Sequence, residues 1–283
     1  FLINMLFGSV EEWQGTQEYE KAEKIIEQVV ANKEYFVKGK EIPVRAFKRA
    51  QQANSITGLD MYIKGIGNLA RIAKDAPFKQ MLKLLKAGSG STLGTCFDGE
   101  PLFSTSHAFD NQAGTQSNLI TGSGVTSALI SADIKTAMSR MMSFYYSNDT
   151  GSAEDEDKAM LNEDPRFVVL CDPSLSAAMK DVRTLETIVI DSNGGSQTNT
   201  LRNNFEIVTR IVDGANPNDY YLIDVSDPSS KPFLIGMEDE GKLVTPQDNS
   251  EALANLQVLR YAYNQMSYGN AYGAWWKIAK INN

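Results

Sequence analysis

The sequence contains very few of the residues that most often carry chemistry. Among 283 residues there are one histidine, His107, and two cysteines, Cys96 and Cys171. A single histidine excludes zinc sites built from several histidines, including the His-Glu-x-x-His helix. The cysteines lie far apart in the sequence and form no Cys-x-x-Cys pair, so they indicate neither a disulfide framework nor a zinc site. Their scarcity fits a reducing cytoplasm.

Long apolar runs are also missing. No run approaches the roughly 18 residues that a membrane-spanning helix needs, so we expect no membrane insertion. The apolar start Phe1–Phe7 is short and lacks the basic flank of a secretory signal. A start at Phe rather than Met is compatible with processing of the N-terminus, and equally with upstream residues that are absent here.

Basic residues are outnumbered. There are 27 Lys and Arg against 35 Asp and Glu, which gives a net charge of −8. This balance argues against a surface built to grip nucleic acid, which needs clustered cations. It does not exclude a protein that encloses nucleic acid, because an acidic wall repels phosphate and leaves it mobile. The length allows a large core and two compact units.

The first quarter of the chain predicts a helix followed by a hairpin. Apolar residues in Tyr19–Val30 recur at steps of three and four, which predicts a packed helix or an arm on a neighbouring subunit. Tyr35–Val37 and Ile42–Phe47 read as strands around a turn at Lys38–Glu41. Pro43 cannot donate to a ladder, so this hairpin would lie at an edge and need support from outside its own fold.

A long helix is predicted next, over Gly58–Ala87. Pro77 interrupts its pattern and predicts a kink or a new start at Ala76–Pro77. Gly88 and Gly90 stand where a helix ends.

The second half predicts alternating helices and strands. A helix is expected over Thr126–Tyr146, a buried strand over Arg166–Cys171, and a helix over Leu175–Val182 with Asp172 as its N-cap. Further strands are expected at Thr187–Ile190, Phe205–Val212, Tyr220–Val225, Phe233–Gly236, Lys242–Thr245, Asn255–Tyr268 and, as a last buried strand with Trp275 and Trp276, Tyr272–Ile281.

The stretch Cys96–Asn118 holds the one histidine. Its Asp98-Gly99 pair predicts a tight turn, flanked by apolar residues, that pins a surface loop to the core. His107 with Cys96 or Ser104 would make a hydrolase only if a base lay within hydrogen-bond reach and a third group oriented it. We favour a structural histidine beside a turn.

Two other stretches invite a ligand site. Gly88–Gly94 superficially resembles a phosphate loop, but it lacks the lysine and follows a helix instead of opening one, so we predict a linker. Glu154–Asp157 clusters carboxylates without the glycine of a calcium loop, which leaves at most a weak surface ion site. The sequence therefore predicts no catalytic, cofactor or metal site.

The densest basic patch, at Lys38, Lys40, Lys48 and Arg49, lies in the predicted hairpin. Two interpretations are given equal weight: the patch is solvated, or it pairs with an acidic neighbouring subunit. Aromatic residues also anchor interfaces, although Trp275 and Trp276 are more typical of a core. The candidates for contact between subunits are Trp13, Tyr35, Phe36, Lys38, Lys40, Arg45, Phe47, Lys48 and Arg49.

Several segments, in this order, resemble one known family. They are Trp13–Gly15, Lys33–Phe47, Met81–Leu85, Cys96–Gly99 through His107, Ser117-Asn118, Val168–Pro173 and Tyr272–Ile278. Together they resemble the major capsid proteins of tailed bacteriophages, closest to the Mu-type major head subunit. Residues 147–164 and 191–204 have no counterpart that we can place.

The resemblance implies an α+β fold, the tailed-phage major capsid fold that encapsulins and herpesvirus capsid floors share. It implies an N-terminal arm (1–32), an extended hairpin loop (33–54), a peripheral lobe with the spine helix (55–121 and 237–269) and an axial lobe (122–236 and 270–283).

The implied function is structural. Hexamers and pentamers would close an icosahedral head around double-stranded DNA, without catalysis, cofactor or metal. Portal, scaffold, maturation protease and decoration protein are implied partners, and the subunit would be assembled in the host cytoplasm and end in the virion. The alternatives are an encapsulin-like compartment, a small hydrolase that uses His107, and a monomeric adhesin or tail component.

Overall fold

The computed structural model divides the chain into two compact units. One comprises Phe1–Ala31, Lys83–Leu234 and Ala271–Asn283, and the other comprises Asn32–Leu82 and Ile235–Asn270. The division into peripheral and axial lobes stays a prediction. The structure describes residues 2–7, 23–28, 32–43, 49, 56–108, 115–145, 164–189, 195–237, 242–244 and 258–283.

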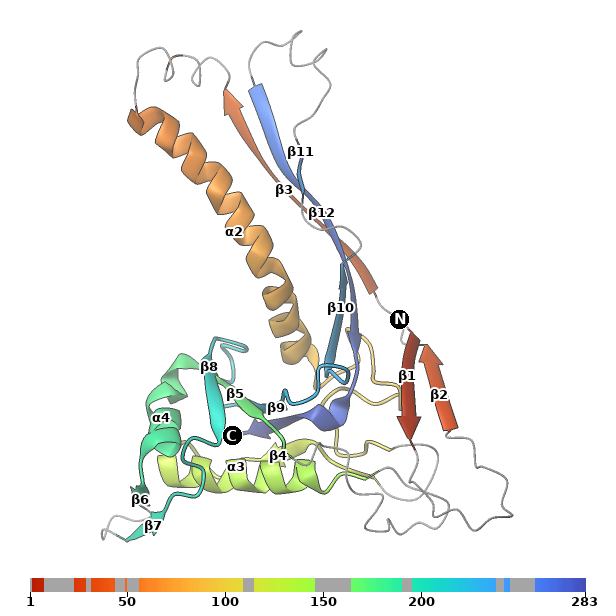
Figure 1. Cartoon of the computed structure of the whole chain (residues 1–283), viewed down its shortest axis with the longest axis vertical. Coiled ribbons are helices and arrows are strands. Elements are labelled where there is room, and N and C mark those ends of the chain that lie inside the picture. The colour runs from red at the N-terminus through yellow and green to blue at the C-terminus, as the bar shows by residue number, and fades with distance from the viewer. Residues whose placement is uncertain are drawn as a thin grey trace. The chain divides into compact units, whose positions relative to one another are not determined.

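A five-stranded mixed sheet forms the core of the first unit (Figure 1). Its strand order is β4-β13-β9-β5-β8, and β4 and β8 run parallel to their neighbours while β9 is antiparallel to both β13 and β5. The strands span Leu119–Thr121 (β4), Ile278–Asn282 (β13), Tyr220–Asp224 (β9), Phe167–Cys171 (β5) and Phe205–Thr209 (β8). The strand predicted at Arg166–Cys171 is confirmed, since β5 lies inside the sheet and is mostly buried.

Two helices, α3 (Ser127–Met142) and α4 (Ser176–Thr184), complete this unit. Thr126 caps α3, and Asp172 caps the short 3₁₀ turn η2 (Pro173–Leu175) that leads into α4, as its sequence predicts. The apolar face of α3 is fully buried, with 0% exposure at Ile130, Ile134, Ala137 and Met141. The helix ends at Met142, four residues before the predicted end.

The aromatic end of the chain differs from the prediction. Trp275–Lys277 forms a 3₁₀ turn, η3, and only Ile278–Asn282 continues as a strand. Both tryptophans are buried, as expected. A turn lets two adjacent indole rings enter the core, whereas neighbouring side chains of a strand point to opposite faces. The strand β6 (Thr187–Val189) was also predicted, but its partner β7 (Ser196–Thr198) was not.

The second unit holds a long strand, β12, and its partners. The strand β12 (Val258–Tyr272) pairs with β3 (Asn32–Pro43) and β11 (Lys242–Val244), and it neighbours β10 (Phe233–Met237). The long strand predicted at Asn255–Tyr268 is therefore confirmed.

The predicted hairpin around Lys38–Glu41 is wrong. The strand β3 runs without a turn from Asn32 to Pro43, and Gly39 lies opposite Ala262 within the ladder. The long partner strand satisfies the backbone on both sides of Gly39, and this pairing outweighs the weak local signal for a turn. Pro43 is the last residue of β3, where a missing N–H group does little harm.

The predicted helix at Tyr19–Val30 is wrong where it can be compared. Residues Glu23–Gln28 form the strand β2, which pairs antiparallel with β1 (Leu2–Phe7). The adjacent Ile25 and Ile26 are β-branched and suit a strand once an apolar partner strand is present. The rest of Tyr19–Val30 lies outside the described residues.

The long helix predicted over Gly58–Ala87 is confirmed: α2 spans Ile56–Ala87 as a single helix. Pro77 lies inside it, so no new helix starts there. After α2 the N–H group of Gly88 donates to the carbonyl of Leu85. A Cβ atom at Gly88 would lie 2.9 Å from the ring of Phe103, so the chain needs glycine here for space. No helix within the described ranges is both long and apolar enough to cross a bilayer.

Candidate functional site: a buried histidine network

The predicted Asp98-Gly99 turn is confirmed. Gly99 has φ +79°, in the left-handed region that favours glycine, and its N–H group donates to the carbonyl of Cys96 over 3.0 Å. The N–H group of Cys96 donates to the carbonyl of Glu100 over 2.8 Å. Oδ1 of Asp98 accepts from the N–H group of Glu100 over 3.1 Å, which leaves Oδ2 to face inward.

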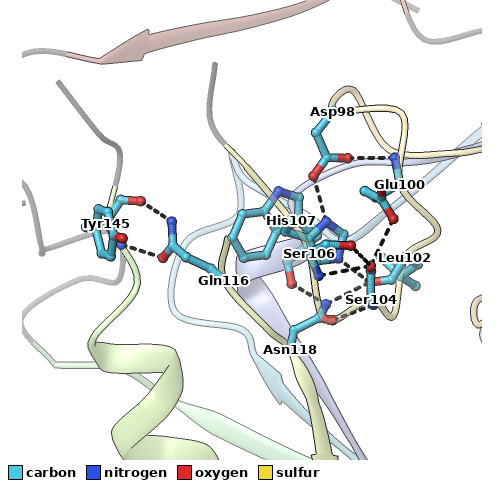
Figure 2. A network of polar contacts seen from close by, with 10 residues as sticks. Asp98, Glu100, Leu102, Ser104, Ser106, His107, Gln116, Asn118 and Tyr145 are labelled. Atoms are coloured by element: carbon cyan, nitrogen blue, oxygen red, sulfur yellow. Dashed lines mark hydrogen bonds and ion pairs between the residues drawn. The ribbon is translucent and has the colours of Figure 1, made fainter. Parts of the chain in front are cut away.

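Oδ2 of Asp98 meets the histidine. It lies 2.6 Å from Nδ1 of His107, while Nε2 of the same ring lies 3.1 Å from the carbonyl oxygen of Leu102 (Figure 2). The side chains of His107 and Asp98 are 0% and 4% exposed. Both ring nitrogens therefore face oxygen atoms inside the protein, and the ring has its full set of partners.

Asn118 joins this turn to the far end of the chain. Its Nδ2 group donates to the carbonyls of Leu102 (2.7 Å) and Trp275 (3.1 Å), and its Oδ1 atom accepts from the N–H group of Ser104 (3.1 Å). Asn118 is fully buried. One amide side chain thus satisfies three backbone groups that would otherwise lack partners in the core.

Gln116 ties the same loop to the segment after α3. Its backbone exchanges two hydrogen bonds with His107, of 2.9 and 2.7 Å. Its side-chain Nε2 donates to the carbonyl of Tyr145 (2.6 Å), and its Oε1 accepts from the N–H group of Tyr145 (2.9 Å) (Figure 2). The network therefore ties residues 96–108 to residues 115–118, and these to the segment after α3.

This geometry does not make a nucleophile. Burial and the nearby Asp98 raise the pKa of the Cys96 thiol well above its usual value, which keeps it protonated. The hydroxyl of Ser104 donates to Glu100 (2.9 Å) and lies 3.1 Å from the hydroxyl of Ser106, and its contacts do not include the His107 ring. The ring of His107 has no nitrogen left to accept a proton from either residue.

A second buried polar pair joins η3 to the end of β9. Nζ of Lys277 is 2.6 Å from Oδ2 of Asp224, and both side chains are almost completely buried. Ser226 donates to both oxygens of that carboxylate. Sequence reasoning missed this pair and the roles of Gln116 and Asn118, although a lysine inside an aromatic, apolar run was a usable signal.

Two other stretches were weighed as ligand sites, and the first of them was predicted to be a linker. Gly88–Gly94 follows the C-terminal end of α2, as a linker does, and offers no helix N-terminus to a phosphate. Within the described part of the chain, no group of three or more His, Cys, Asp or Glu residues could hold a metal ion. Glu154–Asp157 lies outside it.

The candidates for contact between subunits are only partly described. Tyr35, Phe36, Lys38 and Lys40 lie in β3, and Arg49 is exposed. Trp13, Arg45, Phe47 and Lys48 lie outside the described residues. Their role stays a prediction.

Comparison with known proteins finds similarity to one family and to one fold. The family model of the Mu-like prophage major head subunit gpT matches residues 4–142, which include His107, Asp98, Gln116 and Asn118 but not their partners Tyr145 and Trp275. None of the curated proteins compared with the chain matches it.

Three solved structures align with nearly the whole chain. A chain from a structure of Mycobacterium phage Patience gives a TM-score of 0.53 at 12% identity, covering 100% of this chain and 78% of that one. The capsid asymmetric unit of cyanophage A-1(L) gives 0.50 at 12% identity, covering 100% and 86%. The procapsid of bacteriophage JBD30 gives 0.45 at 13% identity, and this chain spans 62% of that chain's length. At these identities the likeness concerns the fold.

Proposed function

We propose that this chain is a major capsid protein of the Mu-like prophage major head subunit family, and that its copies form hexamers and pentamers which close an icosahedral head around double-stranded DNA. The single observation that carries the proposal is the family match over residues 4–142. The fold supports it, because the alignment to the capsid asymmetric unit of cyanophage A-1(L) covers the whole of this chain.

The histidine network suits a shell subunit. A ring-forming subunit reuses one heterologous interface many times, so a small error in subunit shape is repeated around the ring. Buried, fully paired polar groups specify a single packing of the loop Cys96–Asn118 against Trp275. We propose that the network keeps the subunit rigid, and that many modest contacts then act together to stabilise the shell.

The contacts themselves are proposed in two N-terminal segments of the chain. Residues 1–32 would act as an arm on a neighbour, and β3 with Lys38 and Lys40 would lie against the acidic surface of another subunit. A portal, a scaffold, a maturation protease and a decoration protein are proposed partners. The subunit would be assembled in the host cytoplasm, would reach the virion, and would have no catalytic role.

The family favours a phage head over an encapsulin-like compartment. The arrangement of His107 favours neither a hydrolase nor any other enzyme that needs a free histidine base, because Asp98 and Leu102 occupy both ring nitrogens.

Electron microscopy of the purified chain tests the proposal. We expect negative-stain images and sedimentation velocity to show rings or closed shells, and nuclease-protected DNA in shells made in the presence of the partner proteins. The variant K38E/K40E should assemble poorly, whereas K180E/R202E, which changes the net charge equally at two exposed positions of the first unit, should assemble normally. A monomer or dimer at every concentration and salt would contradict the proposal, and shells filled with protein cargo would favour a compartment.

A further inference from the structure

The exposed face of α2 is basic although the protein is acidic. From Asp60 to Lys86 the helix carries six basic residues and two acidic ones, and all eight are exposed. The basic residues are Lys64, Arg71, Lys74, Lys79, Lys83 and Lys86. The chain as a whole has a net charge of −8, so the sign of the charge on this stretch is opposite to that of the whole chain.

The spacing places these charges in a row. Exposed positions recur every three or four residues, the period of one helix face, at 60, 64, 68, 71, 75, 79, 83 and 86, and the exposed Lys74 lies beside this series. From Lys64 to Lys79 the row is about 22 Å long at 1.5 Å per residue. The row follows α2, the long orange helix in Figure 1, and passes Pro77 inside that helix.

Several carboxylates on the described surface already have partners. Glu206 pairs with Arg166, and Glu186 lies 3.9 Å from Arg202. Asp213 accepts from Lys86 and from its own loop. These three carboxylates are therefore poor partners for α2 of a second copy.

A duplex of DNA is a good complement. Each of its strands presents one phosphate per about 3.4 Å of axis, and a basic row of about 22 Å therefore runs along roughly six phosphates. Such contact needs no base readout, because phosphates position a protein without reading sequence. The acidic remainder of the chain would be repelled by the same phosphates, which orients the chain with α2 toward the nucleic acid.

We infer that the exposed face of α2, centred on Arg71, Lys74 and Lys79, binds the phosphate backbone of double-stranded DNA without sequence preference. The inference rests on the proposed function, since the shell is what brings duplex DNA to the subunit. It adds a surface and an orientation to that function: the helix faces the enclosed DNA, and the acidic remainder keeps most of the subunit from adhering to it.

Fluorescence anisotropy with a labelled 30-base-pair duplex of random sequence tests the surface on the full chain. At about 50 mM salt we expect R71E/K79E to bind at least about tenfold more weakly than the unmodified chain. The slope of log K against log salt should fall by about two, because each lost phosphate contact removes about one. The variant K180E/R202E, with the same change in net charge, should stay within about twofold of the unmodified chain.

A variant that removes a negative charge from the row, instead of positive ones, provides a second test. Asp75 lies in the row between Arg71 and Lys79, so D75N should bind the duplex more tightly. Equal loss in R71E/K79E and K180E/R202E would reduce the effect to net charge and overturn the inference. So would unchanged binding in R71E/K79E, or an unmodified chain that does not bind the duplex.

Assembly of the same variants separates this inference from the proposed function. Shells of R71E/K79E that look normal but release DNA more readily in salt would support the inference. Loss of assembly in R71E/K79E with duplex binding intact would identify the face as a contact between copies, and would overturn it. If the unmodified chain never assembles, the proposed function fails, and the anisotropy result still decides whether α2 binds the duplex.

Discussion

The imidazole ring of His107 stacks on the indole ring of Trp275, with ring centroids 4.3 Å apart and an angle of 4° between the planes. The ring of Phe144 meets the same indole nearly edge-on at 5.1 Å and 72°. Trp275 thus touches the loop that carries His107 and the segment that follows α3. The only histidine of the chain is held by a carboxylate, a carbonyl and an aromatic face at once, and this predicts a structural role that mutation can test.

Replacing His107 by alanine should lower the free energy of unfolding by about 3–5 kcal/mol, because the buried carboxylate of Asp98 loses its partner. Urea-induced unfolding of the unassembled subunit measures it, with T105A on the exposed part of the same loop as the control. The double variant D98A/H107A should lose at least about 1 kcal/mol less than the sum of the single changes. Simple additivity would show that the two side chains are not coupled.

Replacing Asn118 tests the junction with the C-terminal segment. N118A removes three hydrogen bonds and leaves the carbonyls of Leu102 and Trp275 short of a donor, which should cost about 2–4 kcal/mol. N118D should cost more, because a carboxylate oxygen would then face those two carbonyl oxygens. Thermal unfolding of both variants checks the order, and an N118D subunit as stable as N118A would contradict the donor role of Nδ2.

Replacing two glycines by alanine should change the stability of the subunit in opposite directions. A Cβ atom at Gly273 would lie 2.3 Å from the backbone carbonyl oxygen of Lys231, so G273A should destabilise the subunit by about 3 kcal/mol. Gly67 is exposed inside α2 and has nothing within 4 Å of such an atom. G67A should therefore stabilise by about 0.5–1 kcal/mol through helix propensity. Calorimetry gives the unfolding midpoint of each variant. Midpoints that both rise or both fall would contradict this prediction.

Both cysteines should be slow to react with thiol reagents in the folded subunit. Burial raises the pKa of Cys171 to about 11 and raises that of Cys96 well above its usual value. The thiolate is the reactive form, so little of it is present at pH 8, and access is also blocked. Labelling with a disulfide reagent should be slow in buffer and fast for two thiols in denaturant. A thiol that reacts rapidly in the native subunit would revive the idea of a nucleophile at Cys96.

Features with local signals could be predicted from the sequence. Asp172 before Pro173 marked a helix start, the apolar period marked α2 and α3, and Asp98-Gly99 marked the turn. Each depends on residues within a few positions of one another, so no knowledge of the rest of the fold is required.

Features that depend on a distant partner could not be predicted from the sequence. Gly39 is a strand residue only because Ala262, far along the chain, lies opposite it, and Ile25 and Ile26 form a strand only beside β1. The same holds for the site. Asn118 acts through Trp275 and Lys277 through Asp224. The apolar run around Lys277 signals a buried lysine, but no local pattern identifies either partner.

The place of β13 in the sheet has a consequence for the timing of synthesis. This strand, Ile278–Asn282, lies between β4 and β9, so the sheet cannot be completed until those late residues have left the ribosome. A polypeptide cut short before Ile278 would leave two open strand edges and an unfilled place among the aromatic residues. Interrupted translation products would thus be unable to adopt the subunit's shape. We therefore expect that they would not be incorporated into an assembling head.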